Sequence, residues 1–188
     1  MKGRKSLRVI TQIHDNTFRK HTGVGLGNFD GLHIGHMALI NTLISECKLN
    51  DLHSVVYTFT KHPETMLRKT LMNQLITTNE QKTKILESTA LDTLYYKEFD
   101  EDFSRLSPEE FIKNILIDTL NVRLTVVGFN YRFGYKGKGD IEYLKKSGEK
   151  YGFRVIVIPP VKVKSEIVSS TLIRDYIKKG KMERVFQL

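Results

Sequence analysis

Residues 25–36 run Gly25-Leu26-Gly27-Asn28-Phe29-Asp30-Gly31-Leu32-His33-Ile34-Gly35-His36, and the expected fold is built around them. A short apolar segment, 22–26, leads into it, and a helical pattern at about 35–48 leads out of it. The glycines between them permit a sharp turn and a close approach of the backbone to a ligand. We therefore expect a strand, a tight turn and a helix whose N-terminal N–H groups and dipole favour a phosphate.

Two histidines mark the end of this turn. His33 and His36 are three residues apart, so both can project from the same side of the first helical turn. Two imidazoles there can donate hydrogen bonds to oxygens that gain charge when an α-phosphate is attacked. The alternatives are a capped turn with one packed and one surface histidine, or a histidine metal site. The metal site lacks a clear third ligand nearby, and the surrounding Gly-Asn-Phe-Asp-Gly favours a nucleotide site.

Beyond this turn, short apolar strands alternate with helical patterns. Such alternation predicts an α/β fold, with a parallel sheet covered by helices on both faces. Ligands of such folds bind beyond the carboxyl ends of the strands, and the motifs described here each follow a predicted strand. The predicted strands are 22–26, 54–59, 94–96, 124–127 and 154–158, and the predicted helices are about 35–48, 79–88, 107–120, 140–150 and 170–179.

Three helix ends carry capping signals. Asn79 is a candidate N-cap. Ser107, followed by Pro108 and by Glu110 three residues on, predicts a capping box. Gly180 stands at the C-terminal cap position of the last long helix.

A second motif, Val168-Ser169-Ser170-Thr171-Leu172-Ile173-Arg174, gathers hydroxyl groups at a helix N-terminus. Arg174 follows Ser170 by one turn on the same side. Hydroxyls, backbone N–H groups and a guanidinium can together bind pyrophosphate oxygens. Taken alone, the motif fits a plain N-cap with a surface arginine equally well. With the histidine turn, it becomes the second half of a two-part phosphate site.

The two motifs together resemble the nucleotidyltransferase superfamily, which has a HxGH turn and a Rossmann-like fold. More closely, the chain from about Thr22 onward resembles the FMN adenylyltransferase (FAD synthetase) module of bacterial bifunctional riboflavin kinase/FAD synthetases. Further shared stretches are Leu75-Ile76-Thr77-Thr78 with Glu80 and Lys82, residues 106–111, and residues 127–134. The HxGH turn identifies only the superfamily, whereas Gly-Phe-Asn-Tyr-Arg-Phe-Gly at 128–134 indicates the flavin-specific branch.

The resemblance implies an enzyme that transfers AMP from ATP to FMN, giving FAD and pyrophosphate, with Mg2+ bridging phosphates. No nucleophilic side chain is needed, and catalysis would come from positioning and charge neutralisation. The implied catalytic residues are His33, His36 and Arg174. The implied ATP-binding residues are Gly27, Phe29, Asp30, Gly31, His33, His36, Ser170, Thr171 and Arg174. The implied flavin-binding residues are His62, Pro63, Asn130 and Phe133, with Asn130 also the candidate metal ligand.

Roles within this set differ. His33 and His36 would stabilise the α-phosphate, and Ser170, Thr171 and Arg174 would hold the β- and γ-phosphates. Gly27, Asp30 and Gly31 would shape the turn, with Asp30 structural rather than catalytic.

The loop at 129–139 suits a flavin on physical grounds as well. Tyr131 and Phe133 alternate with Asn130 and Arg132, which places aromatic faces beside polar groups. Without the resemblance, an ordinary mobile loop with one buried aromatic side chain would be the preferred interpretation.

The chain departs from the family pattern at two places. Where the family usually has Thr-Phe-Asp-Pro-His-Pro, this chain has Thr58-Phe59-Thr60-Lys61-His62-Pro63. Lys61 could supply a phosphate contact. Asn130 stands where many relatives carry Asp, which removes a negative charge and could weaken a metal contact.

Composition limits the class of protein. The net charge of +9 fits either a nucleic-acid binder or a field that attracts anionic metabolites. The lysines are spread along the chain, and we do not expect a nucleic-acid partner. No apolar run approaches the roughly 20 residues that span a bilayer, so we expect no membrane partner and a cytoplasmic protein. The single cysteine, Cys47, excludes an internal disulfide and is expected to pack on a helix.

The domain prediction is a single adenylyltransferase domain, 1–188, without a riboflavin kinase domain. Full-length bifunctional relatives carry such a kinase domain after this point, so a C-terminal kinase domain is a candidate partner in a longer protein. Two alternative functions remain at this stage. One is another nucleotidyltransferase of the superfamily, and the other is a catalytically weak regulator that binds nucleotides or nucleic acid.

Overall fold

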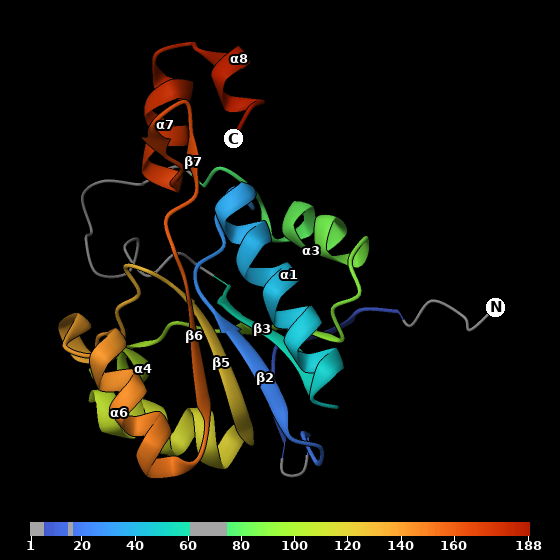
Figure 1. The fold of residues 1–188 in the computed structure, drawn as a ribbon, viewed down its shortest axis with the longest axis vertical. Coiled ribbons are helices and arrows are strands. Elements are labelled where there is room, and N and C mark those ends of the chain that lie inside the picture. The colour runs from blue at the N-terminus through green and yellow to red at the C-terminus, as the bar shows by residue number, and fades with distance from the viewer. Residues whose placement is uncertain (1–5, 15–16, 61–74) are drawn as a thin grey trace.

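The computed structural model describes residues 6–14, 17–60 and 75–188. Its centre is a six-stranded sheet in the order β1-β4-β3-β2-β5-β6, in which every neighbouring pair is parallel (Figure 1). The predicted α/β class and parallel sheet are therefore confirmed. The strands are β1 (Arg8–Ile10), β2 (Thr22–Leu26), β3 (His53–Phe59), β4 (Thr93–Lys97), β5 (Val122–Gly128) and β6 (Arg154–Ile158).

Helices cover both faces of the sheet. Apolar side chains of α1 and α3 pack on one face, and those of η1 and α6 pack on the other. In the described chain, no helix is both long and apolar enough to cross a membrane. The helices are α1 (Ile34–Leu49), α3 (Asn79–Glu87), α4 (Glu101–Arg105), α5 (Pro108–Glu110), η1 (Phe111–Thr119), η2 (Tyr135–Gly137), α6 (Ile141–Tyr151), α7 (Ser170–Lys178) and α8 (Met182–Val185).

The strand order reverses beside β2. The chain proceeds from β2 outward through β3 and β4, and then returns to place β5 on the other side of β2. In open α/β sheets, ligands bind beyond the carboxyl ends of the strands at such a switch point. The turn at 27–33 follows β2, and the loop at 129–139 follows β5, so the topology brings two predicted motifs to one place.

The helix predicted over 107–120 is not a regular α-helix, which corrects the prediction. After the short α5, η1 is a π-helix in which Leu120 N donates to Ile115 O at 3.0 Å. The wider hydrogen-bond spacing places Phe111 and Leu116, five residues apart, in the same core. The capping box of Ser107 and Glu110 is confirmed, with Pro108 at the first helical position.

Other helix ends differ from the prediction in detail. Thr78, not Asn79, is the N-cap of α3, because its hydroxyl accepts the N–H of Gln81 within a capping box. Gly180 follows the C-cap of α7 with φ of +66°, as its position predicts. The elements that are not among the predicted strands and helices are short: β1, α4, η2, α8 and the antiparallel pair β7 (Lys162–Val163) and β8 (Glu166–Ile167).

Gly23 and Cys47 make a tight contact between β2 and α1, which yields a test of the core. Cys47 is buried, as predicted, and a Cβ on Gly23 would overlap its Sγ. We expect Gly23→Ala to lower the free energy of unfolding by about 1–3 kcal/mol through overpacking. Cys47→Ala in the same chain should recover most of that loss, as measured by urea unfolding. Equal stability of Gly23→Ala and the wild type would contradict this account of the contact.

Candidate active site

A cavity of about 1230 Å³ opens at the carboxyl end of the sheet. Its walls come from the turn after β2, the end of β3, the loop after β5, the segment after β6 and the start of α7. Most of the predicted site residues that lie in the described chain line it, namely Gly27, Phe29, His33, His36, Asn130, Phe133, Ser170, Thr171 and Arg174. Asp30 and Gly31 lie behind this wall. His62 and Pro63, together with Lys61, fall outside the described residues.

The two histidines pack against each other at the start of α1. Their rings are stacked, with centroids 3.7 Å apart, and Phe29 meets His36 edge-on at 5.3 Å. His33 is the N-cap, and its Nδ1 accepts the backbone N–H of His36 at 3.3 Å. The proton of neutral His33 therefore lies on Nε2. The Nδ1 of His36 is buried and has no hydrogen-bond partner among the described residues.

Burial controls the charge of this pair. It lowers the pKa of His33 to about 4, although the nearby Asp30 carboxylate opposes the shift. Burial also lowers the pKa of His36 well below its usual value, and the charges of His33 and Lys82 add to this effect. Both imidazoles are therefore neutral at pH 7, and each carries a single N–H.

Acid should destabilise the ligand-free protein through His33. Because its pKa is lowered in the folded state, the unfolded chain binds this proton more tightly, and stability falls as the pH falls from 6.5 toward 4. We expect a loss on the order of 3 kcal/mol, measured by urea unfolding at a series of pH values. His33→Asn, which keeps a capping oxygen, should flatten this part of the profile. A variant with the wild-type profile would show that other groups cause the acid loss.

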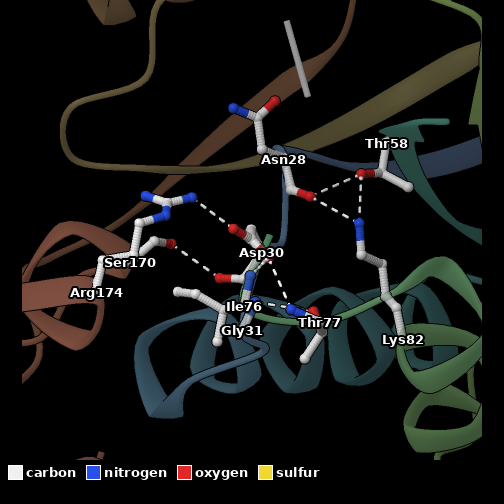
Figure 2. A network of polar contacts seen from close by, with 9 residues as sticks. All are labelled: Asn28, Asp30, Gly31, Thr58, Ile76, Thr77, Lys82, Ser170 and Arg174. Carbon is white, nitrogen blue, oxygen red and sulfur yellow. Dashed lines mark hydrogen bonds and ion pairs between the residues drawn. The ribbon is translucent and has the colours of Figure 1, made fainter. Parts of the chain in front are cut away.

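Asp30 joins three segments that are distant in sequence (Figure 2). Its Oδ1 accepts the backbone N–H groups of Ile76 and Thr77 at 2.9 and 3.1 Å. Its Oδ2 pairs with Arg174 at 2.5 Å. The side chain of Asp30 is 3% exposed and that of Arg174 is 16% exposed, so this ion pair is largely removed from solvent.

The start of α7 is tied to the same turn. The Ser170 hydroxyl donates to the Asp30 carbonyl at 2.9 Å, and Ser169 supplies the N-cap of the helix. Phe29, Gly31 and Leu32 all have positive φ values, 49°, 87° and 39°. Positive φ costs little in Gly31, but in Phe29 and Leu32 it stores backbone strain. The contacts of Asp30 and Ser170 hold this strained turn against α7.

Lys82 supports the turn from the side of α3, and the sequence patterns did not mark it as a site residue. Its side chain is buried, and its Nζ donates to the carbonyl oxygen of Asn28 at 2.9 Å and lies 3.5 Å from Thr58 Oγ1 (Figure 2). Burial lowers the pKa of Lys82 to about 8, against the attraction of Asp30. A buried ammonium group therefore lies next to the turn at 27–33, where the sequence predicts a phosphate site. Fully buried lysines are rare unless they are paired. The burial of Lys82 therefore indicates that it supports the turn.

The other end of the cavity is aromatic. Phe133 is 6% exposed and packs between Tyr131, at a centroid distance of 5.8 Å, and Phe111, at 5.3 Å. The preceding Asn130 is exposed at the cavity wall. The loop is more ordered than a plain mobile loop, because Phe133 and Gly139 form a backbone bridge. A cluster of Phe59, Phe99 and Phe103, which the motifs did not indicate, completes this wall.

Gly134 shows why this loop needs glycine. Its φ is +71°, and a Cβ would lie 2.8 Å from the backbone nitrogen of Pro108. Tyr135 N also donates to Leu106 O, at 2.6 Å. The loop after β5 is therefore held against the start of α5, and its aromatic side chains face the cavity in a defined arrangement.

A parallel sheet with helices on both faces, and a histidine-bearing turn at its switch point, define the Rossmann-like fold of nucleotidyltransferases. The FAD synthetase family model matches residues 15–172, and the chain belongs to this family.

Individual relatives agree with this assignment. The chain is 37% identical, over 179 residues, to a bifunctional riboflavin kinase/FMN adenylyltransferase of Buchnera aphidicola subsp. Schizaphis graminum, covering 94% of this chain and 57% of that protein. It is 29% identical to an FAD synthetase of Listeria monocytogenes, covering 87% of this chain and 66% of that protein. A crystal structure described as a macrolide-efflux protein from Streptococcus pneumoniae superposes with a TM-score of 0.78 at 29% identity, covering 91% and 55% of the two chains. The chain thus spans little more than half the length of most of these relatives.

Proposed function

We propose that this chain is an FMN adenylyltransferase, which joins FMN and the AMP part of ATP into FAD and releases pyrophosphate. One observation carries the proposal: a single cavity has the histidine turn and the start of α7 at one end and an aromatic wall at the other. A polyphosphate suits the first end, because helix N-termini and N–H donors favour anions. A planar aromatic ring suits the second.

The reaction would proceed by in-line displacement. An oxygen of the FMN phosphate forms a bond to the α-phosphorus of ATP, the α–β bridging P–O bond breaks, and pyrophosphate leaves with that electron pair. His33 and His36, neutral and stacked, would each present an N–H to the α-phosphate oxygens as charge develops. Thr171 and Arg174 would hold the β- and γ-phosphates. Ser170 would act there only after its bond to the Asp30 carbonyl is exchanged.

Mg2+ belongs to the proposal as the ion that neutralises phosphate charge. Among the described residues, no group of three or more His, Cys, Asp or Glu side chains could hold a metal. Asn130 offers one amide oxygen at the cavity wall, and oxygen is the ligand that Mg2+ prefers. We propose that the ion arrives on the triphosphate and that Asn130 supplies a single additional contact.

The proposal also covers the extent of the domain, its compartment and its place in a longer protein. Residues 1–188 would form one adenylyltransferase domain in the cytoplasm, and His62 and Pro63 would contribute to the flavin site. The relatives named as bifunctional kinases are longer than this chain, which supports a riboflavin kinase domain in the full-length protein.

The proposal is tested by incubating the purified protein with FMN, ATP and Mg2+ and separating the flavins by chromatography. We expect FAD and pyrophosphate to appear in equal amounts. Omission of Mg2+, with a chelator present, should suppress both products. If FMN and ATP bind but no FAD forms, the chain is a binding protein rather than a transferase. If FMN does not bind, the flavin assignment is wrong, and another nucleotidyltransferase substrate must be sought.

A further inference from the structure

Tyr57 carries a buried hydroxyl group that the site described above does not use. The residue lies near the end of β3, is 2% exposed and lines the cavity. Its Oη has no hydrogen-bond partner among the described residues. Burying a hydroxyl without a partner costs about 1–3 kcal/mol. We therefore expect a bound molecule to supply the hydrogen bond that this hydroxyl lacks.

A neighbouring buried tyrosine, by contrast, has partners for its hydroxyl. Tyr96 lies on the adjacent strand β4 and is also buried, but its hydroxyl donates to the carbonyl of Asn79 at 2.9 Å and lies 3.1 Å from Thr83 Oγ1. That hydroxyl ties α3 to the sheet. Tyr57, with its side chain on the opposite face of the sheet, makes no comparable bond to any residue that the structure describes.

Aromatic rings hold Tyr57 at the flavin end of the cavity. Its ring meets those of Tyr95, Phe59 and Phe111 edge-on, at centroid distances of 5.2, 5.8 and 6.4 Å. Phe59 and Phe111 line the same cavity. Three edge-on contacts from different elements leave the ring little freedom, so its hydroxyl has a fixed position. A fixed polar group in an apolar wall is the arrangement that orients a ligand.

We propose that the hydroxyl of Tyr57 binds the polar edge of the isoalloxazine ring and so selects for a flavin. This inference rests on the proposed function. A flavin ring has an apolar benzenoid part, which suits the aromatic wall, and an edge that carries carbonyl and N–H groups. Burial, with the neighbouring Tyr95, Tyr131 and Asp100, raises the pKa of Tyr57 well above its usual value. The group therefore remains a hydroxyl, able both to donate and to accept.

The test compares Tyr57→Phe with Tyr95→Phe. The first removes only the orphan hydroxyl, and the second removes a hydroxyl from a neighbouring ring that does not line the cavity. FMN binding is measured by calorimetric titration, the KM for ATP by initial rates, and the stability of the ligand-free proteins by thermal unfolding. We expect Tyr57→Phe to raise the Kd for FMN about tenfold, the equivalent of one hydrogen bond. Its ligand-free melting temperature should equal or exceed that of the wild type.

The outcomes separate the possible failures. Unchanged FMN affinity in Tyr57→Phe would overturn the inference while leaving the proposed function intact. A lower melting temperature with unchanged FMN affinity would also overturn it, because the hydroxyl would then bind a structural water. An equal loss of FMN affinity in Tyr95→Phe would overturn it as well, since the effect would not belong to the cavity. A wild-type protein that does not bind FMN at all would refute the proposed function itself.

Discussion

His36→Ala is expected to lower the rate of FAD formation by a factor on the order of 10²–10³. The Nδ1 of His36 is buried and has no hydrogen-bond partner in the described part of the chain, and its ring is fixed between His33 and Phe29. A donor fixed in advance stabilises developing charge without having to reorganise, which is why its loss should fall on the rate of the chemical step. The measurement is single-turnover formation of FAD at saturating FMN and ATP.

The control is His21→Ala. His21 is exposed beside the first residue of β2, at the opposite end of the sheet from the cavity, and its ring bonds to Asn121. We expect wild-type turnover from this variant. Circular dichroism should show both variants folded. If His36→Ala kept more than about a third of the wild-type rate, His36 would be a packing residue of the turn and not a catalytic one.

The turn itself was predictable because its signals are local. Glycines, an apolar strand and a following helical pattern within residues 22–48 suffice to place the histidines at a helix N-terminus. The spacing of three residues predicts that His33 and His36 project from the same side, and in the structure their rings stack. The same holds for the start of α7 and for the capping box at Ser107, where the signal and the structure lie within a few residues.

The contacts of Asp30 were not predictable from such patterns. Asp30 was expected to shape the turn, but its partners lie 46, 47 and 144 residues away in sequence. Only the folded sheet brings Ile76, Thr77 and Arg174 together. For the same reason, the sequence patterns predicted only a phosphate-binding role for Arg174, whereas the structure shows it as the partner of the buried Asp30 carboxylate.

Two further features were beyond sequence patterns for other reasons. Lys82 falls in a predicted helix, where a lysine is ordinarily exposed to solvent. Its burial comes from contacts distant in sequence, such as that with the Asn28 carbonyl in the turn after β2. The hydrogen bonding of η1 was missed because an apolar face at helical spacing fits α- and π-helices almost equally well over nine residues. Missing the burial of Lys82 and the π-helical bonding of η1 does not change which predicted site residues lie at the cavity.

Asp30→Ala is expected to lower the free energy of unfolding by about 3–5 kcal/mol, because it removes the buried carboxylate that pairs with the guanidinium of Arg174. It also removes the acceptor of the Ile76 and Thr77 N–H groups. Urea unfolding of both proteins measures the difference. The control is Asp175→Ala, which breaks the exposed pair with Lys179 at 2.8 Å on the same helix and should cost less than about 1 kcal/mol.

Asp30→Asn divides this effect into its two parts. Asparagine keeps a side-chain oxygen for the Ile76 and Thr77 N–H groups but carries no charge for Arg174. The step from wild type to Asp30→Asn therefore measures the ion pair, and the step from Asn to Ala measures the anchoring of residues 76–77. If Arg174→Ala cost as much in the Asp30→Ala background as in the wild type, the two residues would not be coupled. The strained turn would then be held chiefly by Ser170 and Lys82, and the ion pair would not be what fixes Arg174 beside the cavity.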